Sequence, residues 1–315
     1  MIYDTAIAIV GPTAAGKSDV AMCVAQRMGG EIISADSMQV YVGMDIGTAK
    51  PARTDRAAVR HHLLDVCLPD DPMSVARYCE LAKAAYEDIR KRGKVAIIAG
   101  GTGLYIDAAT RGFLFPEAEA DEGLRKNLYA RAEAEGAAAL HKELEEVDVE
   151  AALRIHPNDA RRIVRALEVY VRSGRPISEL QRQDSQNSGI PARFYGLRTE
   201  RAALVRRIEA RVDRMMDDGL LDEVGRLVEQ GYGNSKVAMQ AIGYKELLAY
   251  IEGKSSLEEA VDRIKAETRK YAKRQMTWFK RYEDITWYDS MEQDADTIAG
   301  LIEADFTGHE DERGS

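Results

Sequence analysis

Residues 11–18 read GPTAAGKS, and this stretch decides the fold. It matches the pattern GxxxxGK[S/T] at every fixed position, with Lys17 as a mobile cation and the Ser18 hydroxyl as a possible Mg²⁺ ligand. An unalternating apolar run, TAIAIV at 5–10, precedes it, and residues 19–28 carry an i, i+4, i+8 apolar stripe. These patterns predict a buried strand and a helix. A loop between them presents backbone N–H groups at a helix N-terminus, which bind phosphate oxygens.

Further segments extend this unit into a sheet. EIISAD at 31–36 and KVAIIA at 94–99 are predicted strands, and between them Ser74 is predicted to cap a helix. RFYGL at 193–197 is predicted to return to the sheet, and TWYD at 286–289 is a candidate edge strand. Alternating strands and helices are typical of parallel βαβ units. The predicted fold is therefore α/β, with a P-loop NTPase-like parallel-sheet core.

The character of the sequence changes after the third predicted strand. Residues 117–150 include 11 acidic and 4 basic side chains, whereas 153–182 include 7 arginines and 3 acidic side chains, and both stretches read as helices. We therefore expect a helical insertion domain at 116–190. The α/β core, with its C-terminal helices, would then comprise 1–115 and 191–315. The acidic end of the chain is expected to fray.

The composition is that of an ordinary globular protein. The chain has 315 residues, of which 45% are hydrophobic and 31% charged, and its formal net charge is −9. The cysteines Cys23, Cys67 and Cys79 lack a metal-binding spacing, which predicts buried thiols in a reducing compartment. No apolar run is long enough to span a bilayer, so we expect a cytoplasmic protein without a membrane partner. The acidic balance counts against a nucleic-acid partner unless basic residues cluster locally.

Basic residues do cluster locally. Residues 263–281 contain 8 Lys or Arg and one acidic residue, and RRIVR at 161–165 is a second basic segment. The apolar seam expected beside the first cluster consists of Leu257, Val261, Ile264, Tyr271 and Trp278. A solvated surface is the alternative interpretation, but a polyanion is the natural partner of such a face. The acidic excess lies elsewhere, chiefly in 117–150 and 289–315.

Polar residues are expected to gather at the carboxyl ends of the strands, where α/β sheets bind ligands. Asp36 is a candidate base or metal ligand, with a turn or helix-cap residue as the alternative. Thr102, within GGTG at 100–103, can bring its hydroxyl to a ligand or form a plain turn. Arg211 lies at the edge of an apolar helical stripe, so it needs either a carboxylate or a bound phosphate as its partner.

The glycine-rich motif commonly indicates ATP or GTP hydrolysis or phosphoryl transfer, which requires a carboxylate at the end of a buried strand. The third predicted strand runs into GGTG without one, although Asp36 could serve. The motif therefore predicts a bound phosphate chain and leaves open whether a nucleoside triphosphate binds or a phosphoryl group moves.

Seven stretches together carry a family pattern. They are GPTAAGKS at 11–18, ISADSMQVYVGMDIGTAKP at 33–51, HHLLD at 61–65, AGGTGLY at 99–105, HPNDARRIVRALEVY at 156–170, QAIGYKE at 240–246 and YAKRQMTWFK at 271–280. In these stretches the chain resembles the tRNA dimethylallyltransferases, also called tRNA isopentenyltransferases. The run at 33–51 and the last two stretches are the most specific, whereas 117–150 and the residues after 290 carry no comparable motif.

The resemblance implies transfer of a dimethylallyl group from dimethylallyl diphosphate to N6 of the adenosine immediately 3′ of the anticodon in tRNA, with release of pyrophosphate. The loop at 11–18 would hold the diphosphate of the donor, with Mg²⁺ near Ser18. Asp36 would accept the N6 proton or orient the amine, and Thr102 would position the diphosphate or the base. The adenosine would be flipped out of the anticodon loop. The insertion would close over the anticodon stem-loop, and a monomer would suffice.

The resemblance also implies two sets of binding residues. Those that would bind the diphosphate are Gly11, Pro12, Thr13, Ala14, Ala15, Gly16, Lys17, Ser18 and Arg211. Those that would contact tRNA are Asp36, Ser37, Met38, Gln39, Thr102, Arg125, Arg161, Arg162, Ile163, Val164, Arg165, Gln240, Ala241, Ile242, Gly243, Tyr244, Lys245, Lys273, Arg274, Gln275, Met276, Thr277, Trp278, Phe279 and Lys280. Salt-dependent tRNA binding, insensitive to loss of the last ~15 residues, is expected.

Two alternatives remain open. A small-molecule enzyme, either an isopentenyltransferase for free adenine nucleotides or a nucleotide kinase, shares the loop but has no use for the basic helix at 263–281. A non-catalytic RNA-binding protein would not depend on Asp36. Incubation with labelled dimethylallyl diphosphate and unmodified tRNA separates these possibilities.

Overall fold

The computed structural model describes residues 3–112, 121–184 and 189–314. The chain separates into two compact units: Met1–Thr110 together with Ile190–Ser315, and Arg111–Gly189. We call them the sheet unit and the helical unit. The sheet unit is thus built from two segments of the chain that flank the helical unit in sequence.

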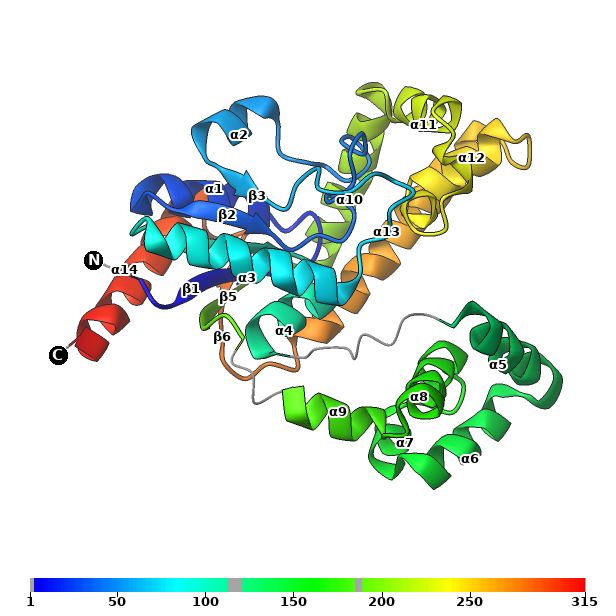
Figure 1. The fold of residues 1–315 in the computed structure, drawn as a ribbon. Coiled ribbons are helices and arrows are strands. Elements are labelled where there is room, and N and C mark those ends of the chain that lie inside the picture. The colour runs from blue at the N-terminus through cyan, green and yellow to red at the C-terminus, as the bar shows by residue number, and fades with distance from the viewer. Residues whose placement is uncertain (1–2, 113–120, 185–188, 315) are drawn as a thin grey trace. The chain divides into compact units, whose positions relative to one another are not determined.

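A six-stranded parallel sheet forms the centre of the sheet unit (Figure 1). The strands are β1(Ala6–Val10), β2(Glu31–Ser34), β3(His61–His62), β4(Ala96–Gly100), β5(Ala192–Arg198) and β6(Ile285–Asp289), in the order β3-β2-β4-β1-β5-β6. Central β1 pairs with β4 and β5, so Ile7 lies opposite both Ile97 and Arg193. The α/β fold with a parallel sheet is confirmed, and β6 is the edge strand that the sequence suggested.

Helices cover the sheet and make up the helical unit. Those of the sheet unit are α1(Lys17–Met28), α2(Arg53–Ala58), α3(Val75–Lys91), α4(Gly103–Arg111), α10(Arg201–Asp217), α11(Leu220–Glu229), α12(Tyr244–Ile251), α13(Leu257–Phe279) and α14(Ala295–Gly314), with short 3-10 turns at Tyr232–Asn234 and Ala238–Gln240. The helical unit contains α5(Glu122–Glu135), α6(Ala137–Val147), α7(Val149–Arg154), α8(Ala160–Ser173) and α9(Ile177–Asp184).

Local sequence signals explain where the first helices begin and end. The Ser74 hydroxyl accepts a hydrogen bond from the Arg77 N–H at 3.1 Å, so it caps α3 as predicted. Helix α1 ends at Gly29, whose left-handed φ of 62° is one that glycine adopts without steric cost. The motif loop therefore lies between a fully buried strand and a well-terminated helix.

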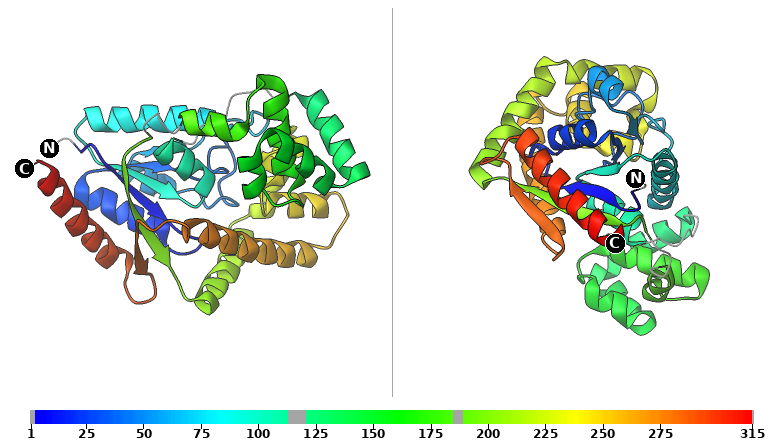
Figure 2. Two further views of the ribbon diagram at one scale, coloured as in Figure 1. Left: turned by 90° about the horizontal axis from the view of Figure 1, so that it is seen from below. Right: turned by 90° about the vertical axis from the view of Figure 1, so that its left-hand side faces the viewer.

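The C-terminal segment is part of the core. Helix α14 packs beside α1 on one face of the sheet, with Ile302 and Phe306 buried in the same cluster as Ile7 and Ile97. Helix α3 packs against β2 and β4 on the opposite face (Figure 2). The expected fraying of the acidic end is therefore wrong for residues up to Phe306, and loss of the last ~15 residues would remove core side chains.

The apolar seam expected on α13 differs from the buried face that forms. Ile264 is buried as expected, but Leu257, Val261, Tyr271 and Trp278 are only partly buried. Instead the buried face consists of Ala260, Ile264, Ala272, Gln275 and Phe279. Small residues and one glutamine thus let α13 approach its neighbours closely, which a search for large apolar residues does not find.

The helical unit has its own hydrophobic core, which includes Leu140 and Leu144 of α6 and Ile163 and Val169 of α8. The three cysteines are free thiols, and Cys67 and Cys79 are buried. Within the described residues, no helix combines the length and the hydropathy that a membrane crossing requires.

Candidate active site

The loop between β1 and α1 has a constrained backbone. Gly11 has a φ of 142°, and a Cβ there would lie 2.6 Å from the Leu197 carbonyl oxygen of β5. Gly16 has a φ of 91°, and Ala14 has a left-handed φ of 63°, which residues other than glycine rarely adopt. These turns wrap the loop around the N-terminus of α1. The loop is thus built to direct backbone N–H groups toward an anion.

Two cations, Lys17 and Arg211, converge on this loop. Lys17 donates a hydrogen bond to the Pro12 carbonyl oxygen at 2.7 Å, and burial, reinforced by the positive charge of Arg211, lowers the pKa of Lys17 to about 7. Arg211 reaches over from α10 to within 3.5 Å of the Thr13 hydroxyl. Burial also lowers the pKa of Arg211. Two desolvated cations held together in this way form a site for an anion of high charge.

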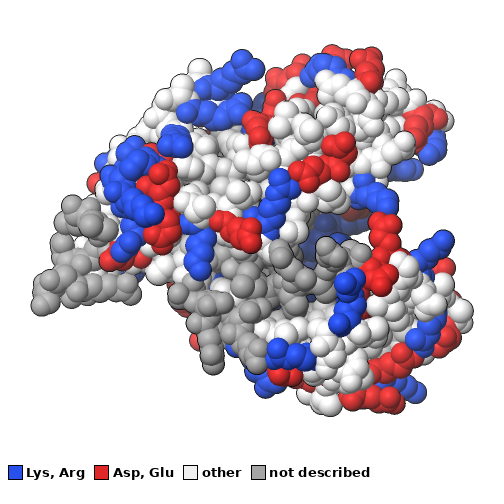
Figure 3. Space-filling view, in the orientation of Figure 1, with Lys and Arg blue, Asp and Glu red and all other residues white. Residues whose placement is uncertain are grey.

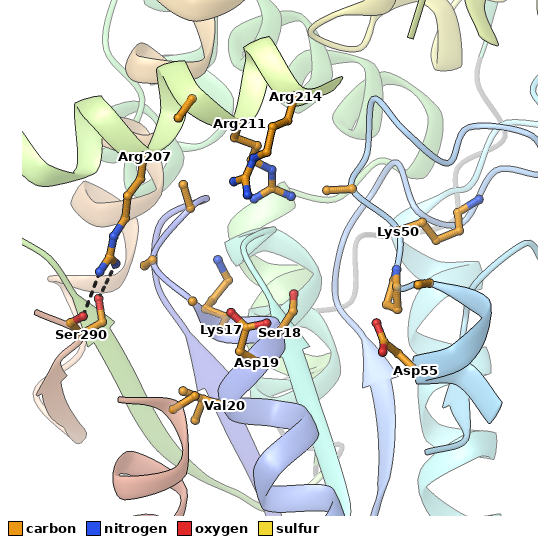
Figure 4. Close-up of a pocket in the computed structure, with 18 of the residues that line it drawn as sticks. Lys17, Ser18, Asp19, Val20, Lys50, Asp55, Arg207, Arg211, Arg214 and Ser290 are labelled. Carbon is orange, nitrogen blue, oxygen red and sulfur yellow. Dashed lines mark hydrogen bonds between the residues drawn. The ribbon is translucent and has the colours of Figure 1, made fainter. Parts of the chain in front are cut away.

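The surroundings of Arg211 distinguish its two expected partners, a carboxylate and a bound phosphate. Among the described residues it forms no ion pair, so a structural salt bridge does not explain its position. It lines a cavity of about 1410 Å³ together with Lys17, Ser18 and Arg214. Figure 4 shows these four side chains around one space. In the same view Arg207 turns away to bond the Ser290 hydroxyl and carbonyl oxygen, at 2.9 and 3.0 Å.

Asp36 lies directly after β2 with one carboxylate oxygen engaged. Oδ1 accepts hydrogen bonds from the backbone N–H groups of Met38 at 2.9 Å and Gln39 at 3.3 Å. These bonds form an Asx turn, so Asp36 does serve as a turn residue. No hydrogen bond to Oδ2 joins it to another described residue. Asp36 is therefore oriented by the turn and keeps an oxygen for a ligand.

Thr102 connects the two strand-end loops. Its hydroxyl oxygen accepts a hydrogen bond from the Ser37 N–H at 3.0 Å, and its own N–H donates to the Ala35 carbonyl oxygen at 3.1 Å. Its carbonyl oxygen accepts from Tyr105 and Ile106 in the first turn of α4. Thr102 thus acts on the loop that carries Asp36, beside the cavity that Asp36 and Lys17 line.

Two smaller cavities connect these groups. One of about 80 Å³ is lined by Lys17, Ser18, Asp36, Arg211 and Tyr271 among others. A second of about 320 Å³ shares Thr13, Asp36 and Arg211, and extends to 240–245 and Arg274. The structure thus brings together the loop, the carboxylate after β2, the partly buried Arg211 and two of the predicted tRNA-contact segments.

The donor set beside Ser18 suits a partly hydrated Mg²⁺. This ion is usually bound by one or two protein oxygens, with waters and phosphate oxygens completing its octahedron. The Ser18 hydroxyl and the Asp36 carboxylate line the same small cavity. Within the described ranges no group of three His, Cys, Asp or Glu side chains could hold a metal, so the remaining ligands would be water and substrate oxygens.

The predicted tRNA-contact segments of the sheet unit divide by exposure. Gln240, Lys273, Arg274, Thr277 and Lys280 are exposed, and Lys245, Met276 and Trp278 are partly so. Three side chains correct the prediction, because they serve the interior. Tyr244 is buried and donates to Glu223 at 2.6 Å, Phe279 is in the core, and Gln275 contacts the loops 11–18 and 100–103.

The predicted contacts in the helical unit divide in the same way. Arg161 and Arg162 are exposed at the start of α8, whereas the Ile163 and Val164 side chains are buried in the core of this unit, which corrects the prediction for both. Arg125 and Arg165 each lie 2.8 Å from Glu168, a fully buried carboxylate. These two arginines therefore also neutralise a buried charge. On the face in Figure 3, basic and acidic side chains are interspersed.

Two buried polar groups that shape the site were missed. Glu223 of α11 accepts hydrogen bonds from the N–H groups of Asp45, Ile46 and Gly47 at 2.8–3.2 Å. Lys50 is buried and pairs with Asp65 at 2.5 Å and Asp45 at 2.7 Å. Both order the segment after Asp36. The family-specific run at 33–51 indicated that this segment matters, but it did not indicate which side chains would be buried.

Comparison with known proteins places the chain among enzymes that modify tRNA. The family described as IPP transferase matches residues 39–282. A tRNA dimethylallyltransferase of Desulforudis audaxviator is 51% identical over 90% of this chain and 91% of its own, and one of Pelotomaculum thermopropionicum is 48% identical over 89% of each. The structure resembles the tRNA isopentenylpyrophosphate transferase of Bacillus halodurans, with a TM-score of 0.72, 39% identity, and coverage of 99% of this chain and 100% of that one. It also resembles a eukaryotic dimethylallyltransferase acting on tRNA, with a TM-score of 0.77, 29% identity, and coverage of 97% and 80%.

Proposed function

The chain belongs to the IPP transferase family, and from that membership we propose the reaction that its site performs. It is a tRNA-modifying prenyltransferase of the kind found in its relatives. We propose that the donor is dimethylallyl diphosphate, and that the acceptor is N6 of the adenosine immediately 3′ of the anticodon. The C1–O bond of the donor breaks, the N6–C1 bond forms, and pyrophosphate and one proton leave.

The observation that carries this proposal is the shared cavity of the phosphate loop, Arg211 and Asp36. Lys17 and Arg211 are both desolvated and repel each other, and a bound diphosphate would offset this repulsion. Negative charge grows on the leaving diphosphate as C1–O breaks, so Lys17, Arg211 and the N–H groups of the loop would stabilise the transition state more than the ground state. When bound, Mg²⁺ beside Ser18 would offset part of the same charge.

Asp36 is the proposed acceptor of the N6 proton. An aromatic amine is a weak nucleophile, so a carboxylate that accepts its hydrogen bond and then its proton assists the attack on C1. The Asx turn fixes Oδ1 and leaves Oδ2 available. Thr102 would support Asp36 indirectly, by holding Ser37 in place. The 320 Å³ cavity, which extends from Asp36 to 240–245 and Arg274, would receive the flipped adenosine.

The remaining proposals concern partners. The anticodon stem-loop would be bound by the exposed basic residues of α13 and by Arg161 and Arg162 of α8. All the proposed reacting groups lie within one chain, which is consistent with a monomeric enzyme. A P-loop can also admit a nucleoside triphosphate, which would then compete with the donor for the loop 11–18.

Transfer of label from dimethylallyl diphosphate to unmodified tRNA is the direct test. We expect one labelled adenosine per tRNA, located beside the anticodon by nuclease digestion. An absence of label with several tRNAs that carry adenosine there would contradict the proposal. A parallel incubation with free AMP distinguishes the small-molecule alternative, because comparable turnover of AMP would make the basic face of α13 irrelevant to the reaction.

A further inference from the structure

Gln275 of α13 is a buried polar side chain whose amide contacts both loops of the site. Its Oε1 accepts a hydrogen bond from the Thr13 N–H at 2.8 Å, and its Nε2 donates to the Gly101 carbonyl oxygen at 3.0 Å. Only 5% of the residue is exposed. The family resemblance implied a tRNA contact for it, but both ends of its amide are engaged inside the protein.

The loop at 100–103 is shaped around this face of α13. A Cβ at Gly101 would lie 2.1 Å from the Gln275 Nε2, and a Cβ at Gly103 would lie 2.3 Å from the Trp278 ring. Trp278 also donates from Nε1 to the Asp107 carboxylate of α4 at 3.0 Å. The face of α13 that carries Gln275 and Trp278 therefore fits into a space that only glycines leave open.

The phosphate loop is strained next to the residue that Gln275 holds. Ala14 adopts a φ of 63°, a conformation that persists in a side chain other than glycine only when its surroundings enforce it. Gln275 fixes the peptide N–H of Thr13, the residue directly before Ala14. The other approach to Thr13 is the longer, 3.5 Å contact from Arg211 to its hydroxyl. Of these two side chains, Gln275 makes the shorter contact with Thr13, while Lys17 and the Ala15 N–H bond the Pro12 carbonyl oxygen on the other side of it.

We propose that Gln275 is a positioning residue for the donor: it holds the loop 11–18 in its strained, diphosphate-binding conformation and makes no contact with tRNA. This inference rests on the proposed role of that loop in binding the diphosphate. Exposed Lys273 and Arg274 on the same helix remain available to the RNA. Helix α13 would then serve the donor through one face and the acceptor through another.

Gln275→Met tests the proposal, because methionine keeps nearly the same volume and makes neither hydrogen bond. Pyrophosphate binding is measured by calorimetry, tRNA binding by filter retention, and kcat and KM are measured for both substrates. We expect pyrophosphate to bind about tenfold more weakly, or about 1.4 kcal/mol, while the Kd for tRNA stays within about twofold. Lys273→Ala is the matched control, expected to weaken tRNA binding and leave pyrophosphate binding unchanged.

A double-mutant cycle tests whether the effect runs through the strained turn. Glycine tolerates a positive φ, so in an Ala14→Gly background the effect of Gln275→Met should shrink to about threefold or less. Gly101→Ala provides an independent route, since its methyl group would displace the amide, and it should reproduce the loss of pyrophosphate affinity without a loss for tRNA. This second variant decides the matter if Gln275→Met fails to unfold cooperatively on heating.

Two results would overturn the inference: unchanged pyrophosphate affinity in Gln275→Met and Gly101→Ala, or a loss for tRNA that exceeds the loss for pyrophosphate. A different result would reject the proposed function itself, namely that the unaltered enzyme binds neither pyrophosphate nor dimethylallyl diphosphate. The two failures are therefore distinguishable in the same set of titrations.

Discussion

At the scale of single residues, Asp36 shows how a structural and a chemical role can share one carboxylate. Oδ1 completes the turn after β2, and Oδ2 remains for the substrate. Asp36→Asn keeps the turn acceptor and removes the base. We expect transfer to fall by about 10²–10⁴-fold, because general-base assistance is of that order, while tRNA binding is largely kept. Single-turnover transfer and filter binding measure the two effects, and equal losses in both would contradict the assignment.

Lys17 makes donor binding dependent on pH. Burial and the neighbouring Arg211 lower its pKa from 10.5 to about 7, so above pH 7 the free enzyme loses this proton, whereas an unfolded chain keeps it up to about pH 10.5. The lysine therefore makes the fold less stable below pH 7, and this penalty is relieved as pH rises from 7 toward 10.5. A bound diphosphate favours the charged form, so its binding should take up a proton above pH 7.

We expect pyrophosphate affinity to fall by up to about tenfold per pH unit above pH 7, beyond the change due to titration of pyrophosphate itself. Calorimetry in two buffers with different ionisation enthalpies measures the proton uptake. Lys17→Arg is the control, because arginine stays charged throughout this range and should remove the extra dependence. Identical pH profiles for both proteins would show that Lys17 is already charged in the free site.

The residues that the sequence identified and those that it missed differ in physical character. Lys17 was predicted from the glycine-rich motif, and Asp36 from its place at the end of a strand. Arg211 was predicted because it lies beside an apolar helical stripe. Glu223 was missed and Gln275 was assigned to the tRNA, because both are buried and bond to backbone groups. Backbone partners leave no trace in the side-chain pattern, so only the fold reveals them.

At the scale of elements, the segment after Asp36 depends on a helix far away in sequence. Glu223 of α11 accepts three backbone N–H groups of residues 45–47 and the Tyr244 hydroxyl. Glu223→Gln replaces an acceptor-only carboxylate by an amide that presents two N–H groups. We expect the free energy of unfolding in urea to fall by about 1–3 kcal/mol. Exposed Asp222→Asn next to it should change stability by less than about 0.5 kcal/mol, and an equal effect of both would argue against the anchor.

Elements escaped prediction where tertiary contacts define them. Strand β3 consists of His61 and His62 only, too short to show a period, and exists because Ile32 and Ile33 pair with it. Helix α14 lies in a segment with 9 acidic residues at 289–315, yet Ile298, Ile302 and Phe306 form an apolar face that packs on α1. Strand β1 and helix α1, by contrast, were predictable because a fully buried run and a glycine-rich loop are local signals.

Helix α13 also allows a test of its exposed face. Each phosphate neutralised by a lysine contributes about 0.9 to the slope of log Kd against log salt for a duplex and about 0.7 for a single strand. Lys273→Ala should therefore reduce that slope by about 0.7–0.9 and weaken binding at low salt. Exposed Lys91, at the end of α3 and outside the basic cluster, provides the control variant Lys91→Ala. An unchanged slope for Lys273→Ala would place the RNA elsewhere.

At the scale of the whole molecule, the negative net charge conceals a segregation of basic and acidic residues along the chain. The net charge is −9, yet residues 263–281 alone contain 8 basic side chains and one acidic one. Net charge therefore says little about which polyanion a protein binds, because the field at a site depends on the residues around it. The proposed binding residues are also divided between the two units. The loops of the proposed diphosphate site belong to the sheet unit, and exposed Arg161 and Arg162 belong to the helical unit.

The helical unit should be removable. Its core forms among its own helices, and the chain leaves and re-enters the sheet unit at neighbouring points, where the Ile190 N–H donates to the Ala109 carbonyl oxygen at 2.8 Å. A chain in which about four Gly and Ser residues join Arg111 to Gly189 should therefore close without strain. We expect it to unfold cooperatively and to bind pyrophosphate within about threefold of the intact enzyme, because no residue of the loop 11–18 or of α10 is altered.

Binding of tRNA should respond differently to this deletion. Loss of the exposed arginines of α8 removes cation–phosphate contacts, so we expect the Kd for tRNA to rise by about tenfold or more at 0.1 M salt, with a shallower salt slope. An intact chain with Arg161→Ala and Arg162→Ala is the control, and it should reproduce part of the loss. Retention of full tRNA affinity without the helical unit would mean that the sheet unit alone recognises the RNA. A truncated chain that cannot bind pyrophosphate would instead show that the two units fold and function as one.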